Sequence, residues 1–169
     1  MKVWLNMLPY ALHNSDITLE TEGVIVSGCN LSGANGSGLA GALKRKWPMV
    51  YKRYMEVYSK WKREDKDIFS HLGDIDIITI DKSLYVINAF TQKYCGYDGK
   101  RYADPDAIDN ALEKVFKFCS LYDLPLKTVK IGCDLGGLSW KDEIEPIFLK
   151  WIAEYPEVEV HIFELDKNK

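Results

Sequence analysis

The sequence has few residues that could build a metal site or a disulfide framework. Its four cysteines, Cys29, Cys95, Cys119 and Cys133, lie far apart without a C-x-x-C pair, and only three histidines accompany them. Zinc sites and disulfide scaffolds both show cysteines or histidines at short, regular spacings. We therefore expect no metal ion and no cofactor, and the unpaired thiols favour a reducing, cytoplasmic setting.

Long hydrophobic runs and an excess of positive charge are also missing. No apolar run approaches the length that crosses a bilayer, and the N-terminal MKVWLNMLPY has no small-residue cleavage site. The formal net charge of −3 gives no general attraction for polyanions. These absences argue against a membrane partner or a nucleic-acid coat, so any phosphate group has to be bound by a local site.

The remaining composition is that of one soluble globular domain. The chain has 169 residues, of which 47% are hydrophobic and 28% charged. It shows no internal repeat, low-complexity stretch or linker, and its most charged run, residues 60–67, is typical of a solvated helix end. We expect a single domain over residues 1–169, and a monomer.

Strand-like and helix-like runs alternate along the chain. This alternation predicts an α/β fold with three α/β/α layers and a mixed central sheet of about six strands. The strand-like runs are KVWL at residues 2–5, GVIVS from Gly23, DIITI from Asp76, LYVINAF from Leu84, TVKI from Thr128 and EVHIFEL from Glu159.

Prolines and an aspartate mark where helices begin. Apolar side chains recur at helical spacing over residues 39–61, and Pro48 divides that stretch into two helices. Asp104 followed by Pro105 is typical of a helix start, because the carboxylate caps free amides and proline fits the first turn. The last helix needs Pro146 in its first turn.

The first chemically informative segment is GCNLSGANGSGLAGALKRKWP, residues 28–48, which follows a strand and opens a helix. A strand that runs through a glycine-rich turn into a helix aims several backbone amides, and the positive end of the helix dipole, at one point. Glycine allows a ligand to approach the backbone closely. The segment indicates a phosphate site, and a loop that merely turns the chain is the alternative.

The literal G-x-G-x-x-G from Gly36 to Gly41 raises a dinucleotide-dependent oxidoreductase as another alternative. A Rossmann glycine turn follows its strand at once, whereas eight residues separate Ser27 from Gly36. The region around Glu56, where that fold places an acidic residue at a strand end, has a helical pattern. No Gly-Lys-Ser/Thr follows, so a P-loop is excluded as well.

A second segment, KIGCDLGGLSW at residues 130–140, repeats the arrangement of strand, glycine-rich loop and helix. Gly132, Gly136 and Gly137 permit a tight backbone wrap, and Ser139 is placed to cap a helix. Either loop alone is weak evidence. Two of them in one short α/β chain predict two walls that grip one diphosphate.

Together these motifs resemble the macrodomain family, in particular its branch of ADP-ribose-1''-phosphate phosphatases and terminal ADP-ribose–protein glycohydrolases. The resemblance runs from Val24 to the C-terminus and rests on Asn30, NGSGLAGALKRKWP at residues 35–48, NAFTQK at residues 88–93 and IGCDLGGLSW at residues 131–140. It implies a single macrodomain that binds ADP-ribose or ADP-ribose 1''-phosphate, with an ADP-ribosylated protein as a further partner.

The resemblance also implies roles for individual residues. Asn30 is expected at the distal ribose and, with Asp134, is a candidate catalytic residue, although a solvated or capping carboxylate is an equal alternative for Asp134. The stretch from Tyr94 to Tyr97 either covers the cleft or packs elsewhere. The remaining residues expected to contact the ligand are Gly28, Cys29, Gly36, Ser37, Gly38, Leu39, Thr91, Gln92, Gly132, Cys133, Leu135, Gly136, Gly137 and Leu138.

The chain departs from the family pattern in its catalytic positions. In the glycohydrolase branch a lysine that attacks the distal ribose follows the strand-end threonine, but here Gln92 stands there and Lys93 comes one step later. That branch has an aspartate where this chain has Gly136, while Asp134 replaces a glycine. The lysine–aspartate mechanism is therefore not supported as written.

The adenine-binding Gly-Asp-Ile that many macrodomains carry after the first strand is absent after KVWL. Asn6 and Met7 stand at that place, and Asp16 within SDIT is the alternative. His13 and His71 lie outside the matched motifs and are expected to be structural or surface residues.

Two functions follow from the resemblance. The first is a hydrolase that acts at the distal ribose, either an ADP-ribose 1''-phosphate phosphatase or a mono-ADP-ribosyl hydrolase. The second is a non-catalytic module that binds or sequesters ADP-ribose or related NAD-derived nucleotides. Composition does not separate them, because the departures favour the binder and the closeness to the hydrolytic branch favours the enzyme.

Overall fold

The computed structural model describes residues 8–164, and within them six strands form one sheet in the order β1-β6-β5-β2-β4-β3. Every neighbouring pair is parallel except β3 with β4. The mixed sheet predicted from the sequence is confirmed. The strands are β1 (Ala11–His13), β2 (Gly23–Asn30), β3 (Ile75–Thr79), β4 (Leu84–Gln92), β5 (Leu126–Thr128) and β6 (Val160–Phe163).

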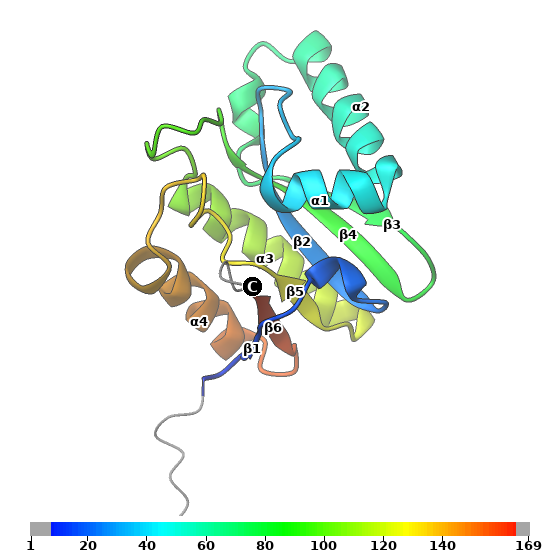
Figure 1. The fold of residues 1–169 in the computed structure, drawn as a ribbon, viewed down its shortest axis with the longest axis vertical. Helices are drawn as coiled ribbons and strands as arrows, with labels where there is room; N and C mark the ends of the chain where they lie inside the picture. Colours follow the sequence, from blue (N-terminus) through cyan, green and yellow to red (C-terminus); the bar gives the residue numbers. More distant parts are fainter. Residues whose placement is uncertain (1–7, 165–169) are drawn as a thin grey trace, which may run out of the picture.

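Helices cover both faces of this sheet. Figure 1 shows α1 and α2 on one side and α3 and α4 on the other, which confirms the three predicted layers. The helical elements are η1 (Ile17–Leu19), α1 (Gly38–Lys46), α2 (Pro48–Glu64), η2 (Ile68–His71), α3 (Pro105–Tyr122), η3 (Trp140–Ile144) and α4 (Glu145–Glu154). None of them, within residues 8–164, has the length and apolar character that a membrane span requires.

The central strand β2 shows why the core divides into two layers. Val24 and Val26 pack with Ile108 of α3 on one face, and Ile25 packs with Leu43 of α1 on the other. All five side chains are fully buried. Because successive strand residues point to opposite faces, an unbroken apolar run is what a strand covered on both sides requires. Each such side chain contributes about 1.5–3 kcal/mol when buried.

The predicted helix starts are confirmed. Pro48 begins α2 directly after α1 ends at Lys46, so the proline does separate two helices. The Asp104 side chain accepts hydrogen bonds from the backbone amides of Asp106 and Ala107, the first turn of α3. Pro146 lies in the first turn of α4, where a missing amide hydrogen is tolerated.

One predicted strand is wrong, and another lies outside the described residues. The prediction of a strand from Thr128 to Ile131 is wrong, because β5 ends at Thr128. The Ile131 amide then donates to the carbonyl of Val129, which turns the chain out of the sheet. The run at residues 2–5 lies outside the described residues, and the first described strand is Ala11–His13, too short for its sequence to show alternation.

A histidine between two carboxylates fixes the connection from α2 to β3. His71 Nδ1 donates to Asp74 Oδ2 at 2.8 Å and Nε2 donates to Asp65 Oδ2 at 2.6 Å, while the ring stacks on Trp61 at 3.7 Å. Lys114 Nζ also contacts Asp74, at 3.2 Å from Oδ1. Carboxylates only accept, so both ring nitrogens must carry hydrogen. Burial lowers the pKa of His71, but its hydrogen bonds to Asp65 and Asp74 outweigh burial and raise the pKa above its ordinary value.

We predict that His71→Ala destabilises the protein more at pH 6 than at pH 9. A raised folded-state pKa gives stability that is complete below the ordinary histidine pKa and is lost as the pH rises through the raised value. The side chain is 20% exposed, so the pH-dependent part is on the order of 1 kcal/mol. Urea unfolding at both pH values measures it, with the exposed Lys66→Ala as control. An equal loss at both pH values would contradict the prediction.

Candidate functional site

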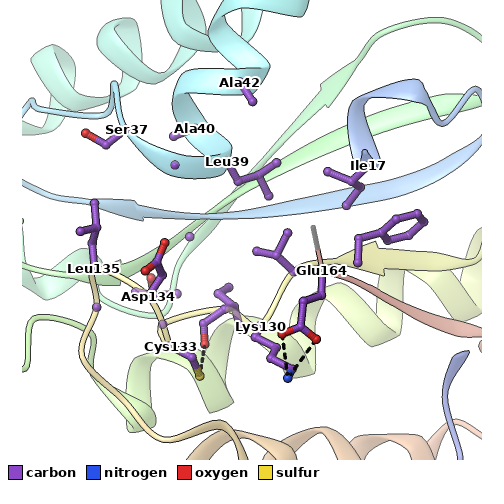
Figure 2. Close-up of a pocket in the computed structure, with 18 of the residues that line it drawn as sticks. Ile17, Ser37, Leu39, Ala40, Ala42, Lys130, Cys133, Asp134, Leu135 and Glu164 are labelled. Atoms are coloured by element: carbon purple, nitrogen blue, oxygen red, sulfur yellow. Dashed lines mark hydrogen bonds and ion pairs between the residues drawn. The ribbon is translucent and has the colours of Figure 1, made fainter. Parts of the chain in front are cut away.

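One cavity lies at the edge of the sheet where the parallel strands end. Strands β2, β4, β5 and β6 run in the same direction, so their carboxyl ends meet there. The cavity holds about 970 Å³, within the range of small-molecule sites. One wall is loop one (residues 31–37) with the start of α1, and the facing wall is loop two (residues 129–139). Figure 2 shows Ser37 and Leu39 opposite Asp134 and Leu135 across this space.

The structure brings most of the sequence-predicted site residues to this cavity. Both glycine-rich segments contribute, so the expectation that they face one another matches the geometry. Asp134 extends from loop two toward the wall that α1 forms (Figure 2). The predicted residues that line the cavity are Gly28, Asn30, Ser37, Gly38, Leu39, Thr91, Gln92, Gly132, Cys133, Asp134, Leu135 and Gly136.

Four predicted contact residues lie outside the cavity lining. Cys29 and Leu138 are buried, at 1% and 5% exposure, and belong to the core behind the walls. Gly36 and Gly137 belong to the two loops but do not line the cavity either. A Cβ on Gly137 would lie 2.4 Å from the carbonyl oxygen of Lys100, so this glycine lets two backbone segments meet.

The cavity has two ends, here called the apolar and the polar end, and the apolar end also carries Asp16 and the ion pair of Lys130 with Glu164. Leu12, Ile17 and Phe163 line the apolar end, where Ile17 and Phe163 join the core cluster beneath α1. In Figure 2, Ile17 lies at one end, together with the ion pair in which Lys130 Nζ is 3.2 Å from Glu164 Oε2, and Ser37 lies at the other. The polar end is lined by Asn30, Asn35, Ser37, Gln92 and Tyr97.

Asn30 is 4% exposed, and its side chain organises loop one. Its Oδ1 accepts from the amides of Ser32 and Ala34, at 3.1 and 3.3 Å, and from the Ser32 hydroxyl at 3.0 Å. Its Nδ2 donates to the Ala34 carbonyl at 2.9 Å. The amide nitrogen carries two hydrogens, so one is left for a ligand, whereas the oxygen is already used.

Tyr54 of α2, which is fully buried, forms a hydrogen bond with the Asn30 side chain. Its hydroxyl lies 2.9 Å from Asn30 Oδ1 and accepts from the Gly33 amide at 3.1 Å. Burial raises the pKa of Tyr54 well above its ordinary value, so the hydroxyl keeps its proton and can donate. This role has no signal in the sequence, where Tyr54 is one of several apolar positions at helical spacing.

The N-terminus of α1 opens into the cavity. Ser37 is the N-cap residue of α1 but makes no side-chain capping bond, and its hydroxyl instead contacts the hydroxyl of Tyr97. The first amides of a helix have no partner within the helix, and the dipole there favours negative charge. Gly38 has φ +56° and a Cβ on it would meet nothing within 4 Å, so its backbone faces open space. These features suit an anion.

The charged and thiol groups around the cavity limit its chemistry. Asp16 Oδ1 accepts from the Thr18 amide and hydroxyl, at 2.9 and 2.7 Å, which lowers the pKa of Asp16. Burial raises the pKa of Cys133 to about 11, so this thiol is not a nucleophilic thiolate at neutral pH. Within residues 8–164 no group of three or more histidine, cysteine, aspartate or glutamate side chains is arranged to hold a metal ion.

Sequence reasoning missed most of the apolar end. Asp16 was an open alternative and does line the cavity, while Asn6 and Met7 lie outside the described residues. Phe163, which ends the strand β6, lines the cavity but is not among the predicted site residues. An aromatic residue at the carboxyl end of a parallel strand was the signal that could have found it, because such strand ends form the binding edge of α/β sheets.

No protein-family model and no curated protein matches the sequence. Solved structures do match over nearly the whole chain. A protein from Bacteroides thetaiotaomicron is 25% identical with a TM-score of 0.77, and the match covers 92% of this chain and 99% of that one. A macrodomain protein from Streptomyces coelicolor is 21% identical with a TM-score of 0.74, over 93% of this chain and 99% of that one.

A third similar structure contains a ligand. DarTG from Thermosipho africanus, solved in complex with ADP-ribose, is 19% identical to this chain with a TM-score of 0.71. The match covers 94% of this chain and 42% of the DarTG chain.

We predict that Gly137→Ala and Gly36→Ala differ sharply in stability. Gly137 has φ +79° and its new methyl group would meet the Lys100 carbonyl, so a loss of about 2–4 kcal/mol is expected. A Cβ on Gly36 meets nothing within 4 Å, so its replacement should change stability by less than about 0.5 kcal/mol. Urea unfolding of both variants measures the difference. Equal stabilities would show that loop two does not depend on this close approach.

Proposed function

Since this chain has the macrodomain fold, as its sequence predicted, we propose that it binds ADP-ribose or a close derivative such as ADP-ribose 1''-phosphate in this cavity. The observation that carries the proposal is a single cavity between two glycine-rich loops with an apolar end and a polar end. The ADP-ribose complex of a protein with the same fold supports it.

The chemistry of the walls supports one orientation of the ligand. The adenine ring belongs at the apolar end, where Phe163 and Ile17 provide apolar surface. The diphosphate belongs between the loops, at the N-terminus of α1, which begins at Gly38. The distal ribose then reaches the polar end, where the remaining Asn30 amide hydrogen and Asn35 can meet its hydroxyl groups.

We predict that the protein binds ADP-ribose at least tenfold more tightly than AMP or ribose 5-phosphate, because each fragment reaches only part of the cavity. Tenfold corresponds to about 1.4 kcal/mol. Titration calorimetry measures the three affinities, and adding a chelator should leave them unchanged. Similar affinities for AMP and ADP-ribose would remove the argument for a two-loop clamp.

A matched pair of glycine variants tests where the diphosphate lies. Gly38 and Gly99 both have positive φ, +56° and +75°, and open space at the Cβ position, but only Gly38 lines the cavity. Gly38→Val should reduce ADP-ribose affinity at least tenfold, while Gly99→Val should not. Melting curves establish that both variants are folded. This pair therefore separates backbone strain from loss of ligand space.

We further propose hydrolysis at the distal ribose. In a phosphatase reaction, water attacks the phosphorus of ADP-ribose 1''-phosphate and releases inorganic phosphate and ADP-ribose. Asp134 on loop two would accept the proton of the water, and the Asn30 amide would hold a ribose hydroxyl or the water. Release of ADP-ribose from an ADP-ribosylated protein is a different reaction at the same end of the ligand, in which water replaces the protein side chain on the distal ribose.

Binding without turnover is the second candidate. Two observations favour it: the Asn30 oxygen is used within loop one, and Gln92 lines the cavity where the glycohydrolase branch carries a nucleophilic lysine. An amide side chain does not replace an amine as a nucleophile. Such a protein would sequester or sense the nucleotide.

Turnover distinguishes the two candidates. For a hydrolase we predict that Asn30→Ala lowers kcat on the order of a hundredfold, since one positioning group is lost, and that Asp134→Ala lowers it similarly, since the proton acceptor is lost. Phosphate release from ADP-ribose 1''-phosphate and ADP-ribose release from an ester-linked modified protein provide the assays. Wild-type protein that binds ADP-ribose tightly but turns over neither substrate would establish the binder.

Asn30→Ala could lower activity either because loop one changes its conformation or because a direct contact with the substrate is lost, and a second variant separates the two causes. Tyr54→Phe removes a hydrogen bond to Asn30 Oδ1 but leaves the Asn30 amide nitrogen in place. If Asn30 acts only by shaping loop one, the two variants should lose activity in parallel. A much larger loss in Asn30→Ala, at comparable melting temperatures, indicates direct contact with substrate or water.

A further inference from the structure

A short segment crosses the rim of the cavity at its polar end. This rim segment, residues 94–98, follows β4 and makes two contacts with the opposite wall. The hydroxyl of Tyr97 contacts the hydroxyl of Ser37, and Cys95 Sγ lies 3.7 Å from the carbonyl oxygen of Ala34. All four residues line the cavity. The rim segment therefore connects with loop one beside the place proposed for the distal ribose.

The start of the rim segment is held by its surroundings. The Gln92 side chain donates to the Tyr94 carbonyl at 2.7 Å, and the Tyr94 ring packs edge-on against Phe69 at 5.4 Å. These contacts fix the point where the segment leaves β4.

The far end is held as well. The Tyr102 hydroxyl donates to Asp98 Oδ1 at 2.8 Å, and the Lys100 amide donates to the same oxygen at 3.2 Å. A Cβ on Gly96 would lie 2.3 Å from the Tyr102 hydroxyl, so the backbone passes directly against this ring. Tyr97 is thus carried by an anchored segment, although its own ring is 76% exposed.

We propose that Tyr97 is a specificity-determining residue that favours free ADP-ribose derivatives over ADP-ribose attached to a protein. The inference rests on the proposed function, because it takes the distal ribose to lie at the polar end. Any group attached to that ribose must leave the cavity past the rim. A phosphate has only three peripheral oxygens, whereas a protein side chain needs a continuous path to solvent. The contact between Tyr97 and Ser37 lies across that path.

The expected discrimination between free and protein-attached ADP-ribose depends on the strength of the Tyr97–Ser37 contact, which has to break. One exposed hydrogen bond between hydroxyl groups favours the closed arrangement by roughly 2- to 10-fold, and displacing the tyrosine ring adds to this. A ligand that binds only the open arrangement has an apparent affinity equal to its intrinsic affinity multiplied by the fraction of molecules that are open. Discrimination of about tenfold is therefore expected.

Binding measurements test the inference independently of turnover. The probes are ADP-ribose and a synthetic peptide that carries ADP-ribose on a serine side chain, titrated into wild type, Tyr97→Phe, Tyr97→Ala and Tyr122→Ala. Tyr122 is an exposed tyrosine at the end of α3, outside the cavity lining, and serves as the matched control. Wild type should bind ADP-ribose about tenfold more tightly than the peptide. Tyr97→Ala should reduce this ratio at least fivefold, Tyr97→Phe should reduce it less, and Tyr122→Ala should leave it unchanged.

The outcomes distinguish this inference from the proposed function. If wild type binds ADP-ribose but the ratio is the same in Tyr97→Ala, or the peptide binds as tightly as ADP-ribose, the role of Tyr97 is overturned and the proposed function stands. If wild type binds neither probe, the proposed function fails and the inference fails with it.

Discussion

The parallel pairing of β2 with β4 and β5 is the constraint on which the site depends. Val24 to Val26 of β2 pair with Leu126 to Thr128 of β5, and β2 pairs with β4 along its whole length. Strands that run in one direction release their following loops at one edge of the sheet. The two glycine-rich loops, separated by most of the chain, face each other for this reason alone. With β5 antiparallel to β2, the second loop would lie at the opposite edge.

The fold and the candidate chemistry make competing demands on Asn30. Its side-chain oxygen, Oδ1, accepts hydrogen bonds from the backbone amides of loop one, and the Tyr54 hydroxyl forms a further hydrogen bond with it. A buried amide is held in one orientation when its partners are satisfied, which prepares the remaining hydrogen for a ligand. The same satisfaction prevents the oxygen from activating water. Asn30 can therefore orient a substrate but is a poor base, so any proton transfer has to come from elsewhere, and Asp134 is the carboxylate on the facing loop.

Features with local signals could be predicted from the sequence, and features that depend on distant pairing could not. The helix start at Asp104 and Pro105 and the helix break at Pro48 can be recognised from a few neighbouring residues. Both glycine-rich loops follow recognisable strands. The apolar end of the cavity arises because β1 pairs with β6, from opposite ends of the chain, which places Ile17 beside Phe163. No local pattern encodes that contact. The misassigned strand after Thr128 has a similar cause, since its β-branched residues suit a strand but have no partner strand there.

The proposed function requires both loops to be firmly braced, because backbone amides would have to recognise the diphosphate. The chain has a net charge of −3, so long-range attraction for an anion contributes little, although Arg45 lines the cavity as well as Lys130, which is paired with Glu164. Amide dipoles act only at short range and in a fixed direction, so their contribution depends on loops that do not rearrange. Loop two is fixed by the Gly136 carbonyl, which accepts from the amides of Tyr102 and Ala103, and loop one is fixed through Asn30. If the proposed function holds, the hydrogen bonds behind the cavity determine affinity as much as the atoms that line it.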